Sequence, residues 1–319
     1  MKEPFLIGVD VGGTNLRVGV LAGQELVWSR RRHAGFSDIF QKVTATEGLK
    51  AVIEVLAEAI EEARTRYPEV QGVGIGFPGF IAPQTRVITL SPNLPGLVNA
   101  DLLTPLKARL GVPVILENDA LAAAYGEYLL HHPYSGSLLF VGLGTGVGGG
   151  LVLNGRPYSG EHGVAMELGH LIVDPGGRAC GCGNRGCLEQ YASAVGIGLT
   201  HAGSGQARLD AEAIAALAHR GDARALNAFE NAARFLAMGL AHVLKVVDVS
   251  EVVIGGGLSA SWPLMAPAFG VHLEAALIPA LRGRIRVTPS KGGDRAGILG
   301  AATLARLSKP ASSAASTSK

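Results

Sequence analysis

Three cysteines and one histidine lie close together in the run HLIVDPGGRACGCGNRGCLE. The four residues are His170, Cys180, Cys182 and Cys187. Three thiolates and one imidazole complete the tetrahedral shell of Zn²⁺, which leaves no open position, so such an ion would be structural. The alternative is three free thiols without a metal. Three nearby glycines are expected to let the chain turn tightly around the ion: Gly181, Gly183 and Gly186.

Two carboxylates flank this cluster. Glu167 precedes His170 by three residues, and Glu189 follows Cys187 by two. A metal would hold these carboxylates and the imidazole in one place, and acceptors fixed in this way suit a ligand with several hydroxyl donors, such as a sugar. Asn93 and Asn118 could add amide donors and acceptors. Each of these residues alone is more often a surface polar group.

A further carboxylate, Asp119, follows a predicted strand over 112–116 and opens a predicted helix over 120–130. The positive end of a helix stabilises an ionised carboxylate, which could then accept a proton from a substrate hydroxyl. Phosphoryl transfer asks little more of a protein than such alignment and neutralisation of charge. From spacing alone, the competing and commoner interpretation is a plain helix N-cap, a role that suits Asp.

Two glycine-rich segments resemble each other. Residues 5–23 read FLIGVDVGGTNLRVGVLAG, and residues 138–155 read LLFVGLGTGVGGGLVLNG. Each segment predicts two strands that reverse at a tight turn, which carries Thr14 in the first copy and Thr145 in the second. Bare backbone N–H groups in such turns can approach phosphate oxygens. The repeat therefore predicts two similar halves and one nucleotide, with its phosphates between the two threonines.

Asp10 ends the first predicted strand, just before Gly12, Gly13 and Thr14. A carboxylate there could hold Mg²⁺, usually through water, because Mg²⁺ favours a few carboxylates together with phosphate oxygens. The alternative is a turn aspartate that binds its own backbone. The sequence has no GxxxxGK[ST] motif, so a P-loop lysine is not expected to hold the phosphates.

The elements that must position these residues follow from hydrophobic spacing. Residues 5–11, 15–21 and 25–30 predict an antiparallel meander. Thr44 and Glu47 predict a capping box ahead of a helix with one apolar stripe. Further strands are predicted at 72–77, ending in Pro78-Gly79, and at 252–254, ending in Gly255-Gly256-Gly257. Further helices are predicted at 222–247 and 294–307.

This alternation is typical of a duplicated α/β fold of the ribonuclease-H-like (actin-like ATPase) class, with two domains around a central cleft. We expect an N-terminal α/β domain over 1–117, rejoined by the helix at 294–307. A larger C-terminal α/β domain would span 118–293 and include the zinc-binding segment 170–187. Residues 308–319 lack core-forming side chains and are expected to be a disordered tail.

Composition excludes several classes of protein. The chain has 319 residues, of which 48% are hydrophobic, so it is not a disordered polymer. A formal charge of +2 implies no broad field for nucleic acid or membranes, and we interpret the basic run 30–32 as a solvated surface. No secretory leader or membrane-length apolar run is apparent. Three clustered cysteines suit a reducing cytosol better than disulfides, so we expect a cytoplasmic protein.

Together these motifs resemble the ROK family of sugar kinases and repressors, most closely its bacterial ATP-dependent glucokinases. The resemblance runs in a consistent order from about residue 5 to about residue 305. The matching segments are 8–14, 117–120, 144–150, 167–170 and 180–189. The cysteine segment together with Glu167 and His170 is highly specific, whereas the glycine loops are much less so.

The resemblance implies ATP-dependent phosphorylation of a sugar 6-hydroxyl, with Asp119 as the base, Mg²⁺ at the phosphates and a structural Zn²⁺ on His170 and the cysteines. His170 would serve zinc and sugar through different ring nitrogens. The implied sugar-binding residues are Gly79, Asn93, Asn118, Asp119, Glu167, His170 and Glu189. The implied nucleotide-binding residues are Asp10, Gly12, Gly13, Thr14, Thr145, Gly146, Gly255, Gly256 and Gly257. Relatives commonly form dimers or tetramers, so a homodimer or homotetramer is expected.

Glucose is the sugar favoured by the similarity around SPNLPG at 91–96. Kinases of mannose, fructose, N-acetylglucosamine and N-acetylmannosamine carry nearly the same motifs, so these sugars remain alternatives. The family's repressors carry an N-terminal helix-turn-helix domain, for which a first strand at residue 5 leaves no room, and they would be expected to lose Asp119. A hydrolase or scaffold on the same fold does not explain the cysteine cluster beside two carboxylates.

Overall fold

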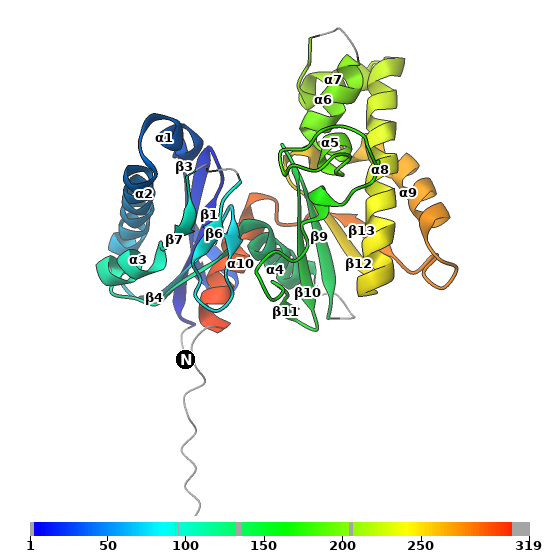
Figure 1. Ribbon diagram of the computed structural model, residues 1–319. Coiled ribbons are helices and arrows are strands. Elements are labelled where there is room, and N and C mark those ends of the chain that lie inside the picture. Colours follow the sequence, from blue (N-terminus) through cyan, green and yellow to red (C-terminus); the bar gives the residue numbers. More distant parts are fainter. Residues whose placement is uncertain (1–2, 93, 95, 132–135, 204–206, 308–319) are drawn as a thin grey trace, which may run out of the picture. The chain divides into compact units, whose positions relative to one another are not determined.

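The computed structural model describes residues 3–92, 94, 96–131, 136–203 and 207–307. The chain forms two compact units (Figure 1). Unit 1 comprises Met1–Leu129, Ser159–Val164 and Asp294–Lys319, and unit 2 comprises Leu130–Tyr158 and Ala165–Gly293. The expected tail at 308–319 lies outside the described residues. Among the described helices, none combines the length and the apolar character needed to cross a membrane.

Unit 1 is built on a five-stranded sheet with the strand order β3-β2-β1-β4-β8. These strands are β1 (Phe5–Val11), β2 (Asn15–Ala22), β3 (Glu25–His33), β4 (Val70–Phe77) and β8 (Val114–Asn118). The first three pair antiparallel, which confirms the predicted meander, and β4 and β8 add parallel strands. A smaller sheet contains β5 (Phe80–Ile81), β6 (Ile88–Leu90) and β7 (Val98–Ala100).

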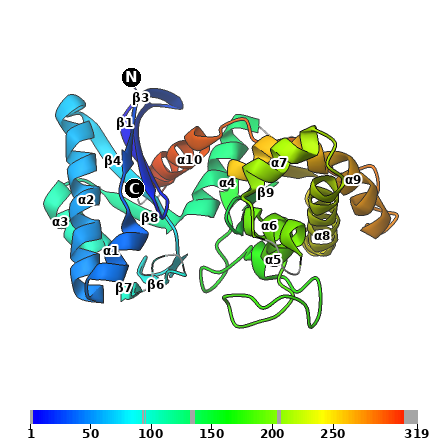
Figure 2. The same cartoon turned by 90° about the horizontal axis from the view of Figure 1, so that it is seen from above.

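Helices cover both faces of the larger sheet of unit 1 (Figure 2). One face carries α1 (Phe36–Lys42), α2 (Ala45–Arg66) and α3 (Leu103–Leu110), and the other carries α4 (Asp119–His131) and α10 (Asp294–Leu307). The predicted capping box of Thr44 and Glu47 is confirmed at the start of α2. Helix α10 approaches the sheet closely because Gly8 and Gly74 have no side chain, and a Cβ at either position would collide with the backbone of α10.

The basic run 30–32 lies on β3, at the edge of the sheet. Alternate residues of a strand share a face, and Arg30 and Arg32 each form an ion pair with Glu62 of α2. Arg31 is exposed on the other face, while Arg32 is partly buried. The run is therefore a largely solvated surface, as interpreted from the sequence, in which α2 supplies a carboxylate to two of its three members.

Unit 2 repeats the same strand order on its own sheet, β11-β10-β9-β12-β13. The strands are β9 (Leu138–Leu143), β10 (Val147–Leu153), β11 (Arg156–Pro157), β12 (Glu251–Gly255) and β13 (Arg286–Pro289). As in unit 1, an antiparallel group of three is extended by two parallel strands. The duplicated α/β fold predicted from the glycine-rich repeat is thereby confirmed.

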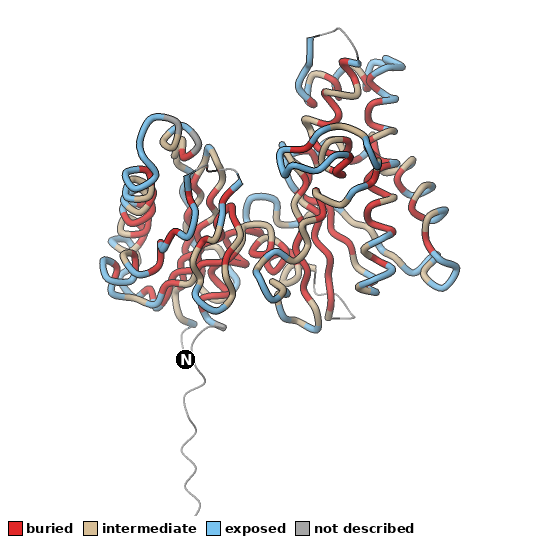
Figure 3. The backbone as a smooth tube through the Cα atoms, viewed as in Figure 1, coloured by how far each residue is buried: buried red, intermediate tan, exposed pale blue. Residues whose placement is uncertain are grey.

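Unit 2 also contains five α-helices and two short 3-10 helices among its described residues. They are η1 (Leu168–His170), α5 (Glu189–Ala192), α6 (Ala194–Ala202), α7 (Ala211–His219), α8 (Ala223–Val247), η2 (Gly257–Ser261) and α9 (Trp262–Ala276). The predicted helix at 222–247 is confirmed as α8, which Asp222 caps by accepting a hydrogen bond from Ala225 N at 2.8 Å. Each unit has its own hydrophobic core, centred on its strands and the helix faces that cover them (Figure 3).

Candidate functional site

Asp10 and Asp119 lie at the same edge of the sheet in unit 1. Asp10 of β1 pairs with Gly76 of β4, which in turn pairs with Glu117 of β8. This register brings the carboxyl ends of three parallel strands together, which is where open α/β sheets bind their ligands. A Cβ on Gly76 would lie 3.4 Å from Asp119 Cα, so the start of α4 sits directly on this edge.

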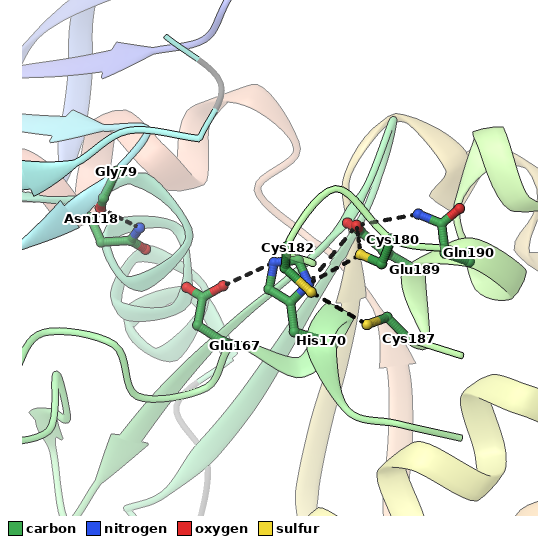
Figure 4. Close-up of polar contacts among 9 residues, drawn as sticks. All are labelled: Gly79, Asn118, Glu167, His170, Cys180, Cys182, Cys187, Glu189 and Gln190. Atoms are coloured by element: carbon green, nitrogen blue, oxygen red, sulfur yellow. Dashed lines mark hydrogen bonds and ion pairs between the residues drawn. The ribbon is translucent and has the colours of Figure 1, made fainter. Parts of the chain in front are cut away.

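Asn118 caps α4 in place of Asp119. Asn118 Oδ1 accepts a hydrogen bond from Leu121 N at 3.0 Å, and its Nδ2 donates to Gly79 O at 3.1 Å (Figure 4). Asp119 is the first residue of α4, and its Oδ1 accepts a hydrogen bond from Ala120 N at 2.9 Å. The interpretation of Asp119 as a plain N-cap is therefore wrong. A primary amide has two N–H donors, so Asn118 retains one for a ligand.

Hydrogen bonds of Ser91 hold the loop after β6 next to the segment that contains Gly79. Ser91 is buried, and its Oγ donates to Pro78 O at 2.5 Å. Ser91 N donates to Leu97 O at 3.1 Å, which closes the loop. Asn93, which the sequence places in the sugar site, lies outside the described residues. Unit 1 thus brings Gly79 and Asn118 together and holds Ser91 against Pro78.

Asp10 has a guanidinium partner that the sequence analysis missed. Arg17 Nη1 lies 3.0 Å from Asp10 Oδ2, and Arg17 Nη2 lies 2.9 Å from Asp294 Oδ1. Burial raises the pKa of Asp10, and the adjacent Arg17 opposes that rise. The alternative of a turn aspartate bound to its own backbone is wrong, because the carboxylate binds a side chain of the opposite strand. Arg17 directly faces Asp10 across the β1–β2 hairpin, so the hairpin register could have revealed the pair.

The two glycine-rich turns present their threonines in the same way. Gly12 N donates to Asn15 O at 2.8 Å in the first turn, and Gly144 N donates to Gly146 O at 3.0 Å in the second. Thr14 and Thr145 are both exposed at the tips of these hairpins. Each unit therefore carries one closed turn with an outward threonine, as the repeat predicts.

The predicted nucleotide-binding residues of unit 2 lie around the second glycine-rich turn. Gly256 has a left-handed backbone (φ 81°), and a Cβ there would collide with Leu143 O at the end of β9. The segment 255–257 therefore lies beside the turn that contains Gly146. A Cβ on Gly146 would in turn lie 2.9 Å from Glu189 Oε2, so a predicted sugar-binding carboxylate borders the predicted phosphate loop.

His170, Cys180, Cys182 and Cys187 form one cluster in unit 2 (Figure 4). Their ligand atoms all lie within 4.8 Å of one another. Cys182 Sγ lies 3.6 Å from Cys187 Sγ, and Cys180 Sγ lies 3.7 Å from His170 Nδ1. Zn–S bonds of about 2.3 Å set a tetrahedral edge of about 3.8 Å, so the donor set and its spacing fit Zn²⁺.

Two of the three nearby glycines shape this loop. Gly183 (φ 92°) and Gly186 (φ 78°) have left-handed backbones, and a Cβ on Gly186 would collide with Asp174 O. Single β-bridges join Ile172 to Cys187 and Ala179 to Arg185. Gly181 does not have a left-handed backbone, and nothing lies within 4 Å of its Cβ position, so the expectation that the turn needs this glycine is wrong.

The two flanking carboxylates lie on either side of the His170 ring. His170 Nε2 is 3.9 Å from Glu167 Oε2, and Nδ1 is 3.9 Å from Glu189 Oε1. Glu189 Oε1 also accepts a hydrogen bond from Cys180 Sγ at 3.0 Å. Burial raises the pKa of Glu167, and it raises the pKa of the Cys180 thiol to about 12. The nitrogen that faces Cys180 is Nδ1, which leaves Nε2 directed toward Glu167.

A strained turn holds Glu167. The preceding residue, Met166, has a left-handed backbone with φ of 66°, which costs a non-glycine residue about 1–2 kcal/mol. Glycines on both sides of the contact let this turn lie on β10, since a Cβ on Gly149 would collide with Met166 O and one on Gly169 would collide with Val147 O. The direction of the Glu167 side chain therefore depends on close backbone contacts with the strand beneath it.

Tyr191 of α5 holds the loop that carries the cysteine cluster. Tyr191 Oη donates to Asp174 Oδ2 at 2.6 Å and accepts from Arg178 N at 2.9 Å. Arg178 Nη1 donates to Gln190 O at 2.6 Å, and its guanidinium lies 4.7 Å from the centre of the Tyr191 ring. The sequence analysis missed these contacts, because no motif links Tyr191 to a residue 17 positions earlier.

The fold and the site together define a duplicated α/β protein of the ribonuclease-H-like ATPase class with a Cys₃His cluster. The ROK family model matches residues 6–307, and the chain belongs to the ROK family. It is 32% identical to the glucokinase of Streptomyces coelicolor, over 95% of this chain and 98% of that protein. It is 34% identical to the N-acetyl-D-glucosamine kinase of Shigella boydii, over 93% of this chain and 98% of that protein. A crystal structure of a ROK family glucokinase from Streptomyces griseus, in complex with glucose and AMPPNP, matches with a TM-score of 0.79 at 29% identity, covering 95% of this chain and 99% of that chain.

Proposed function

We propose that this chain is an ATP-dependent sugar kinase that transfers the γ-phosphoryl group of ATP to the 6-hydroxyl of glucose. Family membership along the whole described chain supports the reaction class. The named glucokinases support the sugar. The observation within the chain that carries the proposal is Asp119 at the first position of α4, with Asn118 taking the capping role.

Asp119 is the general base of this reaction. As the sugar 6-oxygen attacks the γ-phosphorus, its proton passes to the Asp119 carboxylate. The bond between the γ-phosphorus and the β–γ bridging oxygen breaks, and ADP leaves. The hydrogen bond from Ala120 N and the positive end of α4 favour the ionised carboxylate before the transfer.

The proposed sugar-binding residues are Gly79, Asn93, Asn118, Asp119, Glu167, His170 and Glu189. The carboxylates accept hydrogen bonds from sugar hydroxyls, and the remaining Nδ2 hydrogen of Asn118 donates to a hydroxyl oxygen. The contact of Gly146 with Glu189 supports a sugar-binding carboxylate close to the phosphate loop.

The proposed nucleotide-binding residues are Asp10, Gly12, Gly13, Thr14, Thr145, Gly146, Gly255, Gly256 and Gly257. Mg²⁺, when bound with the nucleotide, would neutralise phosphate charge at Asp10. Arg17 already occupies Asp10 Oδ2, which favours contact between this carboxylate and the ion through water.

Zn²⁺ is a structural ion on His170, Cys180, Cys182 and Cys187. The closed set of four ligands supports this role, because it leaves no position for an activated water. His170 uses Nδ1 for the metal and keeps Nε2 for the sugar, which agrees with the partners that each nitrogen faces.

Replacing the base tests the proposal. Asp119→Asn is expected to lower kcat for glucose by about 10²–10⁴, the usual worth of a general base. Glucose binding should remain nearly intact, because the amide keeps the size and polarity of the side chain. The matched control is Asp101→Asn, since Asp101 also lies at a helix start and accepts from Thr104 N at 3.0 Å. Near-normal turnover of Asp119→Asn in a coupled ADP-release assay would reject the role.

A second candidate substrate has its own support. The 34% identity to an N-acetyl-D-glucosamine kinase favours that sugar as the alternative to glucose. The same coupled assay should compare glucose, mannose, fructose, N-acetylglucosamine and N-acetylmannosamine by kcat/KM. The glucose proposal fails if any of the other four sugars gives the highest value.

The remaining parts of the proposal concern the setting of the enzyme. Its partners are a small sugar and ATP, with no nucleic acid or membrane, and it works in the cytoplasm as a homodimer or homotetramer. Sedimentation equilibrium of the purified protein measures the mass of the assembly, and a monomer at micromolar concentration would contradict this part.

A further inference from the structure

We propose that Arg86 is a positioning residue for Asn118 and Asp119, acting through the buried carboxylate of Glu117. The inference rests on the proposed role of Asp119 as the base. It concerns residues of unit 1 only, and three independent observations carry it: a left-handed backbone, a buried ion pair, and a continuous set of hydrogen bonds that ends at the start of α4.

Arg86 has a backbone conformation that arginine rarely adopts. Its φ is 59°, in the left-handed region that favours glycine. The described non-glycine residues with positive φ are Arg86, Asn99, Asn154, Met166 and Asp248. Asn and Asp tolerate this region comparatively well, whereas a long side chain there marks a place where the surroundings impose the conformation. Hydrogen bonds from Arg86 N to Ala82 O (2.7 Å) and from Ala82 N to Val87 O (2.9 Å) fix this turn.

The arginine side chain reaches a carboxylate that is almost completely buried. Arg86 Nη1 lies 2.5 Å from Glu117 Oε2, and the Glu117 side chain is 8% exposed. The same nitrogen donates to Leu116 O at 3.5 Å. Among the described residues, Arg86 is the only cation that pairs with Glu117. A buried carboxylate needs such a partner, because burial disfavours an isolated charge.

Glu117 links the Arg86 ion pair to the proposed catalytic residues. Its Oε1 accepts a hydrogen bond from the backbone N of Asn118 at 3.0 Å. Asn118 then uses its side chain to cap α4 at Leu121 N and to bind Gly79 O. Asp119 is the next residue and the first of α4. The 82–87 turn therefore fixes the backbone at the point where the base leaves β8.

Substitutions of Arg86 can distinguish a positioning role from a merely stabilising contact with Glu117. Arg86→Gly removes the guanidinium and suits the left-handed backbone, so it introduces no backbone strain. We expect kcat for glucose to fall by about 10-fold to 100-fold, since small misplacements of catalytic groups have effects of this size. KM for ATP should stay within about twofold of the wild-type value, because the glycine turns do not depend on Arg86.

A double variant distinguishes positioning of Asn118 and Asp119 from simple neutralisation of Glu117. It also keeps the test valid if Arg86→Gly alone is unstable. Arg86→Gly combined with Glu117→Gln removes the unpaired buried charge, so thermal stability should recover while kcat stays low. Arg86→Lys should restore part of kcat, because it keeps a cation at this position. The matched control is Arg109→Ala, which removes a surface ion pair with Glu54 and Glu61 and should leave kcat unchanged.

Each outcome bears on the inference. If kcat of the double variant returns to the wild-type value, Arg86 only neutralises Glu117 and the positioning role is overturned. If wild type is active, Asp119→Asn is inactive and Arg86→Gly has normal kcat, the inference fails while the proposed function stands. If wild type phosphorylates no sugar, the proposed function fails and the inference fails with it.

Discussion

The carboxylates at the strand ends of unit 1 have partners of two kinds, guanidinium groups and a backbone N–H. Asp10 binds the guanidinium of Arg17, and Glu117 binds that of Arg86. Burial raises the pKa of Asp10, and the adjacent Arg17 opposes that rise. Asp119 instead accepts a hydrogen bond from the backbone N of Ala120. Asp119 remains the proposed proton acceptor because it stands at the first position of α4, with Asn118 taking the capping role.

The Cys₃His cluster leads to a prediction about its one exposed cysteine, Cys182. Cys182→Ser removes one of four ligands without disturbing the buried residues Cys180 and Cys187. Loss of an outer-shell partner lowers metal affinity by about 10–100-fold. Loss of a direct ligand should lower zinc affinity by more than this. Because the proposed metal would order the loop that carries His170 and Glu189, thermal stability and glucose affinity should fall together.

Metal analysis, thermal unfolding and calorimetric glucose titration measure these three effects. Chelation of the wild-type protein should reproduce the losses, and added Zn²⁺ should reverse them in the wild type alone. Wild-type protein that contains no zinc when purified without chelator would contradict the metal assignment. Loss of zinc without loss of glucose affinity would contradict the link between the metal and the sugar site.

At the scale of elements, close backbone contacts through glycine place the site. The turn at 166–169 lies on β10 because neither Gly149 nor Gly169 carries a side chain. The same device brings the segment 255–257 against the end of β9, where Gly256 approaches Leu143 O. These contacts carry no charge, yet they determine where Glu167 and the predicted phosphate loop lie.

Two glycines of unit 2 provide a matched test of this idea. Gly169→Ala should destabilise the fold by about 1–3 kcal/mol, because its Cβ would press on the backbone of Val147. It should also weaken glucose binding, since it shifts Glu167 and His170. Gly181→Ala should change neither property, because nothing lies within 4 Å of that Cβ position. Urea denaturation and glucose titration measure both variants, and equal effects of the two substitutions would contradict the argument.

The parts of the site that could be predicted from the sequence are those built by short segments. Both glycine-rich hairpins and the Cys₃His cluster follow from spacing within about 20 residues, because turns and tetrahedral ligation are local. Arg86 and Glu117 are separated by 31 positions, and Arg17 and Asp294 belong to opposite ends of the chain. Such pairs depend on which strands become neighbours in the sheet, which hydrophobic periodicity alone does not determine. The N-cap interpretation of Asp119 was wrong because the preceding asparagine competes for the same role.

At the scale of the whole molecule, the chain builds one strand order twice and completes unit 1 with its last helix. Each sheet combines an antiparallel group of three strands with two parallel strands. Unit 1 needs α10 to cover the face of the sheet opposite α2, and the buried residues of α10 include Ile298, Leu299 and Ala302. The N-terminal strands can therefore reach their final packing only after the C-terminal helix is present.

Truncation tests this dependence of unit 1 on the end of the chain. A chain that ends at Leu307 should keep the wild-type midpoint of thermal unfolding, because residues 308–319 carry no core-forming side chain. A chain that ends at Gly293 lacks α10, which leaves Gly8 and Gly74 open to water and exposes the apolar sheet around them. Removing one side of a packed core forfeits far more free energy than the 5–15 kcal/mol by which a domain is typically stable. Circular dichroism and limited proteolysis should then show no cooperative unfolding of unit 1, and a wild-type transition in the shorter chain would contradict the assignment of α10 to the core of unit 1.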